Sequence, residues 1–324
     1  MIMKKYLLPF ILLACIQSPC ICAELYTVII SGGRGKLFNH ERYWNDCAFF
    51  YRTLRQTYHL PQDYITLLMA DGDDPAPDML RNGAAGFISS PTDLDGDGKA
   101  DLHLAATREN LEATFSQLSH RLTANDHLFI FVIDHGERSD DDEAFLWLWD
   151  NGQLRPWELA TMVNQCHPAT MNILLGQCHA GAFVGPLQGE GRIITTACSD
   201  DEMSWSCLDR PYDEFFYHWI CAVAQHDELG NRVVSDFDND GRVTMAEAFE
   251  YAMQHDRRSE TPIITAQPWQ IASEWSFGNF LRDDGISIVA TSSDLSPRYH
   301  LSGRRSTASE TGLYIENGQL RFKL

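Results

Sequence analysis

The sequence predicts an α/β fold in which helices cover both faces of a mostly parallel central sheet. Apolar runs of strand length alternate with segments of helical periodicity along residues 25–224, and this alternation is typical of parallel sheets with crossover helices. Two of the apolar runs, 128–133 and 172–175, lead directly into polar and reactive side chains. Open α/β sheets present such groups at the carboxyl edge of the strands, where these folds bind ligands.

The first 23 residues have the pattern of a secretory signal. Lys4-Lys5 precede an apolar run over residues 6–16, and small residues end the segment at Cys22-Ala23. The run is too short for a membrane span. We expect cleavage after Ala23; the alternative is that residues 12–15 form a bacterial lipoprotein box, which would place a lipid anchor on Cys15. Both alternatives predict an exported protein.

Strand, helix and strand then follow in the order of a parallel sheet. Residues 25–31 are apolar and β-branched, and the glycine cluster 32–35 ends them. These glycines are not a dinucleotide-binding fingerprint, because the third glycine of G-x-G-x-x-G is absent. Apolar spacing predicts a helix over residues 41–58, which Pro61 stops, and residues 65–69 supply the next strand.

The later elements continue this alternation. We expect helices at 107–122, 156–164 and 212–224, and strands at 128–133, 145–149, 172–176 and 192–197. Thr107 has the residue type of an N-cap, and Glu109 follows closely. Five or six strands with flanking helices therefore account for residues 24–224.

Two strand ends are candidates for a catalytic pair. One strand leads into Asp134-His135-Gly136, and the other leads into Gly176-Gln177-Cys178. If the strands are neighbours, Cys178 and His135 meet at the carboxyl edge, which suits a cysteine nucleophile and its histidine base. Taken singly, each motif is more often structural, since a cysteine after an apolar run is usually a small buried hydrophobe.

Two acidic loops carry the pattern of calcium ligands. In residues 236–247 every position of a twelve-residue calcium loop is filled, by Asp236, Asp238, Asp240, Gly241, the carbonyl of Arg242, Thr244 and Glu247. Residues 93–104 offer Asp93, Asp95, Asp97, Lys99 and Asp101, although Leu104 stands where the bidentate glutamate belongs. The alternative for each loop is a solvated acidic turn. We predict structural calcium, a helix over 245–254, and no organic cofactor.

Charge and cysteine content exclude several classes of function. The net charge of −20 at pH 7 argues against nucleic acid and anionic membrane surfaces as partners. Apart from Cys178 and the first 23 residues, the chain has five cysteines, an odd number without close paired spacing, namely Cys47, Cys166, Cys198, Cys207 and Cys221. They indicate neither a disulfide framework nor a zinc site.

In this order and with their neighbours, the His135 and Cys178 motifs resemble those of the legumain-like cysteine peptidases of the caspase-like clan. The similarity spans about residues 25–224, and further blocks carry it: Asn39, Cys47, Thr195-Thr196-Ala197, Ser204-Trp205-Ser206-Cys207, Asp213 and Trp219. It implies a caspase-like three-layer αβα sandwich and an endopeptidase acting on peptide or protein substrates. In this family pattern Cys178 forms an acyl-enzyme, His135 is the acid and base, and the N–H groups of Gly136 and Cys178 stabilise the oxyanion.

The same resemblance assigns Ser204, Trp205 and Asp213 to the pocket for the residue before the scissile bond. The arginine that completes this pocket falls nearest Glu41 or Arg42, and only one of these adjacent residues can face it. With Arg42 inward the resemblance implies asparagine selectivity, whereas with Glu41 inward two acids favour lysine or arginine. Gly176 also departs from the pattern, because legumains carry an acid there.

The predicted organisation is a signal at 1–23, a peptidase domain at 24–280 and a β tail at 281–324. The tail, with short strands expected near 299–305 and 312–320, resembles sorting segments of exported proteins in some Gram-negative bacteria; the alternative is a closing hairpin. The calcium loops and Glu260-Thr261-Pro262 suggest a bacterial branch, with a secreted, periplasmic or surface location. Two rival functions are a transpeptidase of the same family and a non-catalytic calcium-binding surface protein on a peptidase scaffold.

Overall fold

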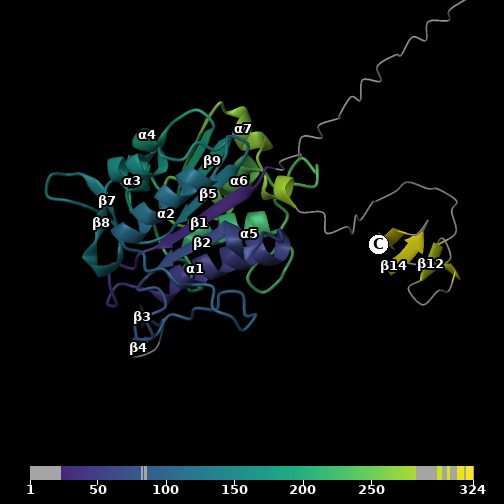
Figure 1. The fold of residues 1–324 in the computed structure, drawn as a ribbon, viewed down its shortest axis with the longest axis horizontal. Coiled ribbons are helices and arrows are strands. Elements are labelled where there is room, and N and C mark those ends of the chain that lie inside the picture. Colours follow the sequence, from purple (N-terminus) through teal and green to yellow (C-terminus); the bar gives the residue numbers. More distant parts are fainter. Residues whose placement is uncertain are drawn as a thin grey trace, which may run out of the picture.

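Six strands form the central sheet, in an order that differs from the order of the chain (Figure 1). This computed structural model describes residues 23–281 except 82, 84 and 85, together with four strands between residues 298 and 323. In spatial order the six strands are β11 (Ile263–Gln267), β10 (Arg192–Thr196), β9 (Thr170–Leu175), β5 (His127–Val132), β1 (Leu25–Ser31) and β2 (Ile65–Met69). All are parallel except β11, which pairs antiparallel with β10 at one edge. The predicted mostly parallel α/β sheet is thus confirmed.

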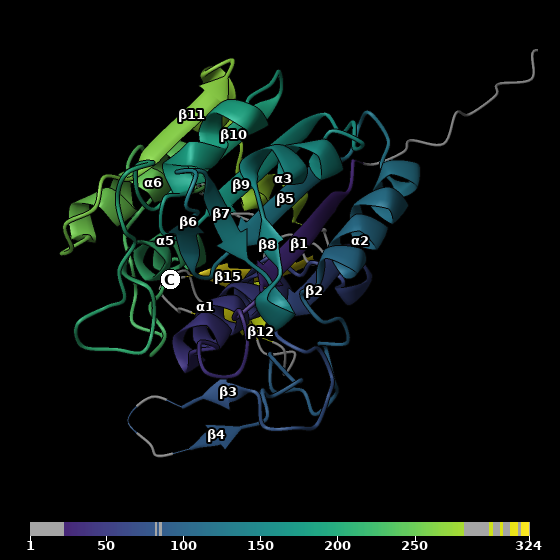
Figure 2. The same cartoon turned by 90° about the vertical axis from the view of Figure 1, so that its left-hand side faces the viewer.

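Helices cover both faces of this sheet and give the molecule three layers (Figures 1 and 2). Side chains alternate along β5, so that Phe129 and Phe131 join one core and Ile130 and Val132 join the other. The first core includes α1 (Glu41–Arg52), α5 (Glu214–Ala224), α6 (Met245–His255) and α7 (Gln270–Glu274). The second includes α2 (Arg108–Arg121), α3 (Pro156–Val163) and α4 (Val184–Leu187).

Local sequence signals explain where several helices begin. The Thr107 side chain accepts a hydrogen bond from the Asn110 N–H at 3.3 Å and caps α2, as its residue type predicts. Thr244 and Glu247 form a capping box at the start of α6. The helix predicted over 41–58 is α1 followed by a π-helical segment, Thr53–Thr57.

Smaller elements surround the sheet. A three-stranded sheet contains β6 (Gly136–Arg138), β7 (Ala144–Trp147) and β8 (Gln153–Leu154), and a hairpin contains β3 (Met79–Leu80) and β4 (Phe87–Ile88). Short 3-10 helices occur at Gln62–Tyr64, Trp149–Asn151, Ala180–Phe183 and Phe277–Phe280. Because β6 begins directly after His135, this small sheet borders the carboxyl edge of β5.

The tail, expected to hold two short strands, contains four. They are β12 (Arg298–His300), β13 (Arg305–Ser306), β14 (Gly312–Glu316) and β15 (Gln319–Lys323), and they form an antiparallel sheet in the order β13-β12-β14-β15. Residues 1–22 of the predicted signal lie outside the described residues. In the described part of the chain, no helix has both the length and the apolar character needed to cross a bilayer.

The strand β11 was not expected from the sequence. Four of its five residues are half-buried, since it occupies a sheet edge and presents no continuous buried face. It returns the chain beside β10 after α6. Because Ile263 pairs with Thr196, the segment 256–262 ends at the carboxyl edge of the sheet.

Candidate active site

Register in the sheet brings His135 and Cys178 together. β5 and β9 are parallel neighbours, and Val132 pairs with Leu175. Each reactive residue stands three positions beyond its partner in this pair, so both side chains emerge at the same level of the carboxyl edge. His135 and Cys178 line one cavity of about 220 Å³. We predicted that His135 and Cys178 would meet if their two strands were neighbours, and β5 and β9 are neighbours.

A backbone carbonyl orients the His135 imidazole. Nε2 of His135 lies 3.0 Å from the carbonyl oxygen of Phe38. A carbonyl only accepts hydrogen bonds, so Nε2 carries the proton in this contact and Nδ1 holds the lone pair of the neutral ring. The Tyr43 ring packs edge-on against the imidazole, with centroids 5.2 Å apart. The Phe38 carbonyl therefore orients His135 as a base, and among the described residues no carboxylate hydrogen-bonds to its ring.

The loop that carries Phe38 is itself held in place. Arg34 lies over the rings of Phe38 and Trp147, at 4.4 and 4.0 Å. The N–H of Phe38 donates to the Gly35 carbonyl at 2.8 Å. Gly33, with φ of +66°, donates its N–H to the Asp134 carboxylate. The glycines that end β1 thus let the loop turn back toward His135.

Asp134 fastens this loop to the end of β5. Its carboxylate accepts hydrogen bonds from the N–H of Gly33 and, at 2.6 Å, from the N–H of His135. Burial raises the pKa of Asp134 to about 7, against the lowering effect of these backbone donors. Asp134 therefore shapes the turn under His135 and does not contact the imidazole through these bonds.

Gly136 makes a close backbone contact with Cys178. A Cβ atom at position 136 would lie 2.0 Å from the Cys178 carbonyl oxygen, so only glycine fits there. Hydrogen bonding from the Gly136 N–H lowers the pKa of Cys178. This donor next to the sulfur is suitably placed to stabilise negative charge that develops on a substrate oxygen.

Burial favours the neutral forms of both candidate catalytic groups. It raises the pKa of the Cys178 thiol and lowers the pKa of the His135 imidazole. The thiol donates a hydrogen bond to the Ser204 carbonyl, with Sγ 3.7 Å from the oxygen. At neutral pH the resting pair is accordingly a thiol beside a neutral imidazole, and the proton moves when the sulfur attacks.

Arg42, and not Glu41, faces the cavity that contains the catalytic pair. Nε of Arg42 lies 3.2 and 3.1 Å from the two carboxylate oxygens of Asp213, and Nη2 donates to the Tyr43 hydroxyl at 2.7 Å. Arg42 and Asp213 line this cavity together with Ser204 and Trp205. The structure thus brings four of the five predicted pocket residues into one site.

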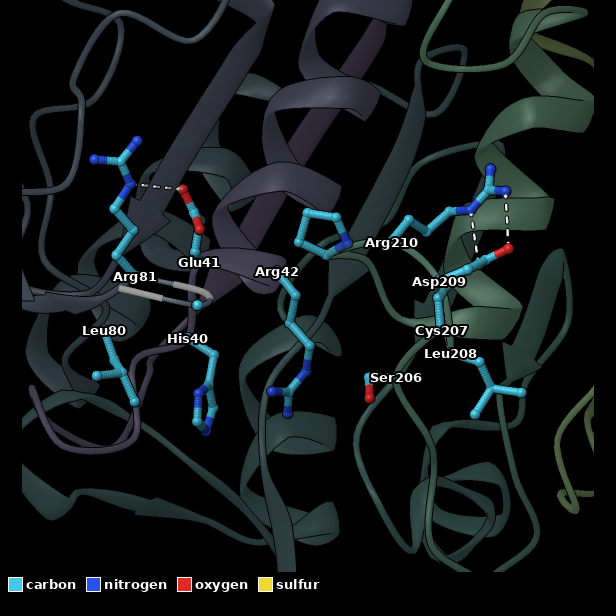
Figure 3. Close-up of a pocket in the computed structure, with 12 residues that line it drawn as sticks. His40, Glu41, Arg42, Leu80, Arg81, Ser206, Cys207, Leu208, Asp209 and Arg210 are labelled. Atoms are coloured by element: carbon cyan, nitrogen blue, oxygen red, sulfur yellow. Dashed lines mark hydrogen bonds and ion pairs between the residues drawn. The ribbon is translucent and has the colours of Figure 1, made fainter. Parts of the chain in front are cut away.

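Glu41 lies in a neighbouring cavity of about 640 Å³, which shares Arg42 and Ser206 with the first (Figure 3). There Glu41 pairs with Arg81, at 3.9 Å, and the Asp209–Arg210 pair lines the far side. Figure 3 shows the side chains of Glu41 and Arg42 leaving the start of α1 in different directions. Glu41 and Asp213 therefore do not converge in the cavity that His135 and Cys178 line.

Each predicted calcium loop brings three carboxylates together. In the second loop, oxygens of Asp236, Asp238 and Glu247 lie within 4.8 Å of one another, and in the first those of Asp93, Asp95 and Asp101 do. Three oxygen donors of one sign suit a hard cation. Two other predicted carboxylate ligands, Asp240 and Asp97, stand outside these clusters, and the predicted ligands Arg242, Thr244 and Lys99 are not carboxylates. Asp97 and Lys99 instead pair with each other at 3.1 Å, and Thr244 caps α6.

Phe38 and Tyr43 were not identified from the sequence. Phe38 acts through its backbone carbonyl, so its side chain gave no signal. Tyr43 contacts Arg42 and His135 at once, which follows only from the position of α1 beside the sheet. All six described cysteines are free.

Comparison with models of protein families identifies the family of this chain. The model of the peptidase C13 family matches residues 25–261, which include the five parallel strands of the sheet, the residues that line the cavity and the acidic loop predicted to bind calcium at 236–247. A search of curated proteins found no match.

Proposed function

The chain belongs to the peptidase C13 family, the legumain family of cysteine peptidases, and from this premise we propose that it is an endopeptidase that cleaves after asparagine. The observation that carries the proposal is the Arg42–Asp213 pair, which lines the same cavity as His135 and Cys178. Peptide or protein is the substrate class of the family.

The reaction proceeds through an acyl-enzyme. The Cys178 sulfur attacks the carbonyl carbon before the scissile bond while its proton passes to Nδ1 of His135. The N–H groups of Gly136 and Cys178 receive the oxyanion. The carbon–nitrogen bond then breaks, the leaving amine takes the proton from His135, and a thioester remains on Cys178. Water attacks this thioester, His135 takes the water proton and returns it to the sulfur, and the acid product leaves.

The chemistry of the pocket matches a carboxamide. Asparagine presents a carbonyl acceptor and an amide donor, and it needs one group of each kind. Arg42 supplies the donors and Asp213 supplies the acceptor, while Tyr43 fixes the guanidinium. A lysine or arginine side chain would place a second cation beside Arg42, so basic residues are rejected.

A fluorogenic peptide library scanning the residue before the scissile bond tests this proposal. Wild-type enzyme is expected to prefer asparagine. Arg42→Lys should lose about tenfold or more in kcat/KM for it, because one ammonium group cannot reproduce both the Nε contact with Asp213 and the Nη2 contact with the Tyr43 hydroxyl. Glu41→Gln is the matched control and should keep the preference.

Cys178→Ala and His135→Ala should each abolish turnover while the fold is retained. A preference for leucine, phenylalanine or a basic residue would contradict the role given to Arg42 and Asp213, and peptide transfer to an added amine in place of hydrolysis would make the enzyme a transpeptidase.

We also propose that the acidic loops bind structural calcium. Asp236, Asp238 and Glu247 would hold one ion, and Asp93, Asp95 and Asp101 would hold another. The ions supply charge neutralisation to loops rich in acids and take no part in the reaction.

Export of the protein is proposed from the sequence, on Lys4-Lys5, the apolar run 6–16 and the small residues at Cys22-Ala23. N-terminal sequencing of the mature protein distinguishes cleavage after Ala23 from lipidation at Cys15.

A further inference from the structure

Asp256 and Glu260 are a pair of carboxyl groups that the proposed mechanism does not use. They lie behind Ser204 and Trp205, which line the cavity of Cys178 and form the wall of the cleft. Asp256 ends α6, and Glu260 follows it in the connection to β11. The two carboxyl groups lie within hydrogen-bonding range of each other. Oε2 of Glu260 accepts a hydrogen bond from the Trp205 N–H at 3.0 Å. Hydrogen bonding with the Ser204 side chain lowers the pKa of Glu260, against the larger raising effect of burial.

Glu260 thus holds the backbone of Trp205, and Trp205 and its neighbour Ser204 line the same cavity as Cys178. The carbonyl of Ser204 accepts the hydrogen bond from the Cys178 thiol. The carbonyl of Trp205 accepts the Glu214 N–H, 2.9 Å away, at the start of α5 and next to Asp213. A shift of residues 204–205 would therefore change the contact with the Cys178 thiol and the contact with the start of α5.

The geometry of the carboxyl pair calls for one shared proton. Oε1 of Glu260 and Oδ2 of Asp256 are inaccessible to solvent, and among the described residues neither meets a donor when both groups are ionised. Two adjoining carboxylates repel each other, whereas a single proton makes one group the donor to the other. Burial and the neighbouring Asp256 raise the pKa of Glu260 to about 9, and burial raises the pKa of Asp256.

Charges around the pair do not replace that proton. Arg258 donates its backbone N–H to Asp256 at 2.7 Å and lowers the pKa of that group, while its guanidinium lies over the Trp205 ring. Glu214 raises the pKa of Asp256. The charge of Glu214 is itself engaged by Arg257, at 3.1 Å.

We propose that Glu260 is a positioning residue of this peptidase, which shares one proton with Asp256 and so holds Ser204 and Trp205 in place beside Cys178. This inference rests on the proposed function. When the shared proton is lost, the carboxylates of Asp256 and Glu260 repel each other. Ser204 and Trp205 are then no longer held in place. An ionised Glu260 also raises the pKa of Cys178, which opposes thiolate formation during attack. Activity should therefore fall on the alkaline side as the pair ionises.

The test compares Glu260→Gln, Glu260→Ala and Asp256→Asn in the full chain, with Glu250→Gln on the exposed face of α6 as the matched control. The carboxamide introduced by Glu260→Gln can accept from the Trp205 N–H and donate to Asp256 permanently. This variant should therefore keep wild-type kcat/KM at pH 6 and extend the alkaline limit by about one pH unit. Asp256→Asn should do the same by donating in the opposite direction. Glu260→Ala should lose about tenfold in kcat/KM at every pH.

Two readouts separate this inference from the proposed function. Labelling of Cys178 by a thiol-reactive peptide electrophile at pH 6 tests the catalytic assignment in wild-type enzyme. Melting temperature against pH, from 6.5 to 9.5, tests the carboxyl pair whether or not the chain is active, and its fall at high pH should be smaller in Glu260→Gln. Identical alkaline limits and melting curves in wild type and Glu260→Gln would overturn the shared proton, and wild-type kinetics in Glu260→Ala would overturn the positioning role.

Discussion

The Cys178 carbonyl sets the residue type at position 136. A methyl group there would overlap this oxygen, and the contact joins the end of β5 to the turn that carries the nucleophile. The same backbone approach brings the Gly136 N–H to the sulfur. Close packing and the placement of the proposed oxyanion donor therefore both depend on the absence of a side chain at position 136.

Gly136→Ala is expected to reduce both stability and activity. The added methyl must push Cys178 away, which should cost about 1–3 kcal/mol of unfolding free energy and remove most of kcat/KM because the donor moves with it. Urea unfolding and steady-state kinetics measure the two effects. Gly185→Ala is the control, since a Cβ atom there meets no atom within 4 Å. Wild-type kinetics in Gly136→Ala would mean that the donor lies elsewhere.

At the scale of elements, α6 connects the acidic loop proposed to bind calcium at 236–247 to the segment behind Trp205. Glu247 belongs to the carboxylate cluster of the second loop and to the capping box that starts this helix. Asp256, at the other end of the same helix, belongs to the carboxyl pair behind Trp205. The loop thus fixes the start of the helix whose end supports the wall of the active site.

Calcium removal is expected to destabilise the protein with only a secondary effect on activity. An ion that binds only the folded chain adds about 2.7 kcal/mol at a concentration one hundred times its Kd. Chelation should therefore lower the melting temperature, and Asp236→Asn with Asp238→Asn should abolish the part of this response that comes from the second loop. Scanning calorimetry with and without calcium measures it, with Glu250→Gln as control. The same melting temperature with and without calcium would refute structural calcium binding.

At the scale of the whole molecule, buried acids around the cleft couple folding to pH. Burial raises the pKa of Asp46 well above its ordinary value, that of Asp134 to about 7 and that of Glu260 to about 9. A group whose pKa is raised in the folded chain stabilises the fold fully below its unfolded pKa, and this contribution is lost as pH rises through the folded value. The pKa values of His40 and His218 are lowered to about 4, so their contribution to stability is lost as pH falls below 6.5. Above pH 6.5 the buried acids therefore set how stability changes with pH.

Stability is accordingly expected to fall between pH 6.5 and 8. Asp46→Asn should reduce this fall, because Oδ1 of Asp46 is buried without a donor among the described residues and an amide can replace the bound proton. Each group contributes a slope of at most roughly 1.4 kcal/mol per pH unit. Chemical unfolding at saturating calcium measures it, with the exposed Asp140→Asn as control. A wild-type stability that rises over this interval would contradict the assignment.

Local pattern in the sequence determined the alternation of strands and helices, the two reactive strand ends and the acidic loops. These features depend on residues close together in the chain, through side-chain periodicity, caps and turn chemistry. His135 and Cys178 were identifiable because the end of a buried parallel strand is visible as a change from apolar to polar residues. The two strands are neighbours in the sheet, so both residues lie at one edge.

Only the tertiary structure decided which side of α1 faces the cleft, and therefore that Arg42 pairs with Asp213 while Glu41 turns to Arg81. It also supplied the Phe38 carbonyl, the Tyr43 contact, the antiparallel edge strand β11 and the support of Glu260 behind Trp205. The physical reason is that these features join residues far apart in the chain. Helix rotation, backbone carbonyls and buried carboxyl pairs take their function from long-range packing, which no local pattern of residue types encodes.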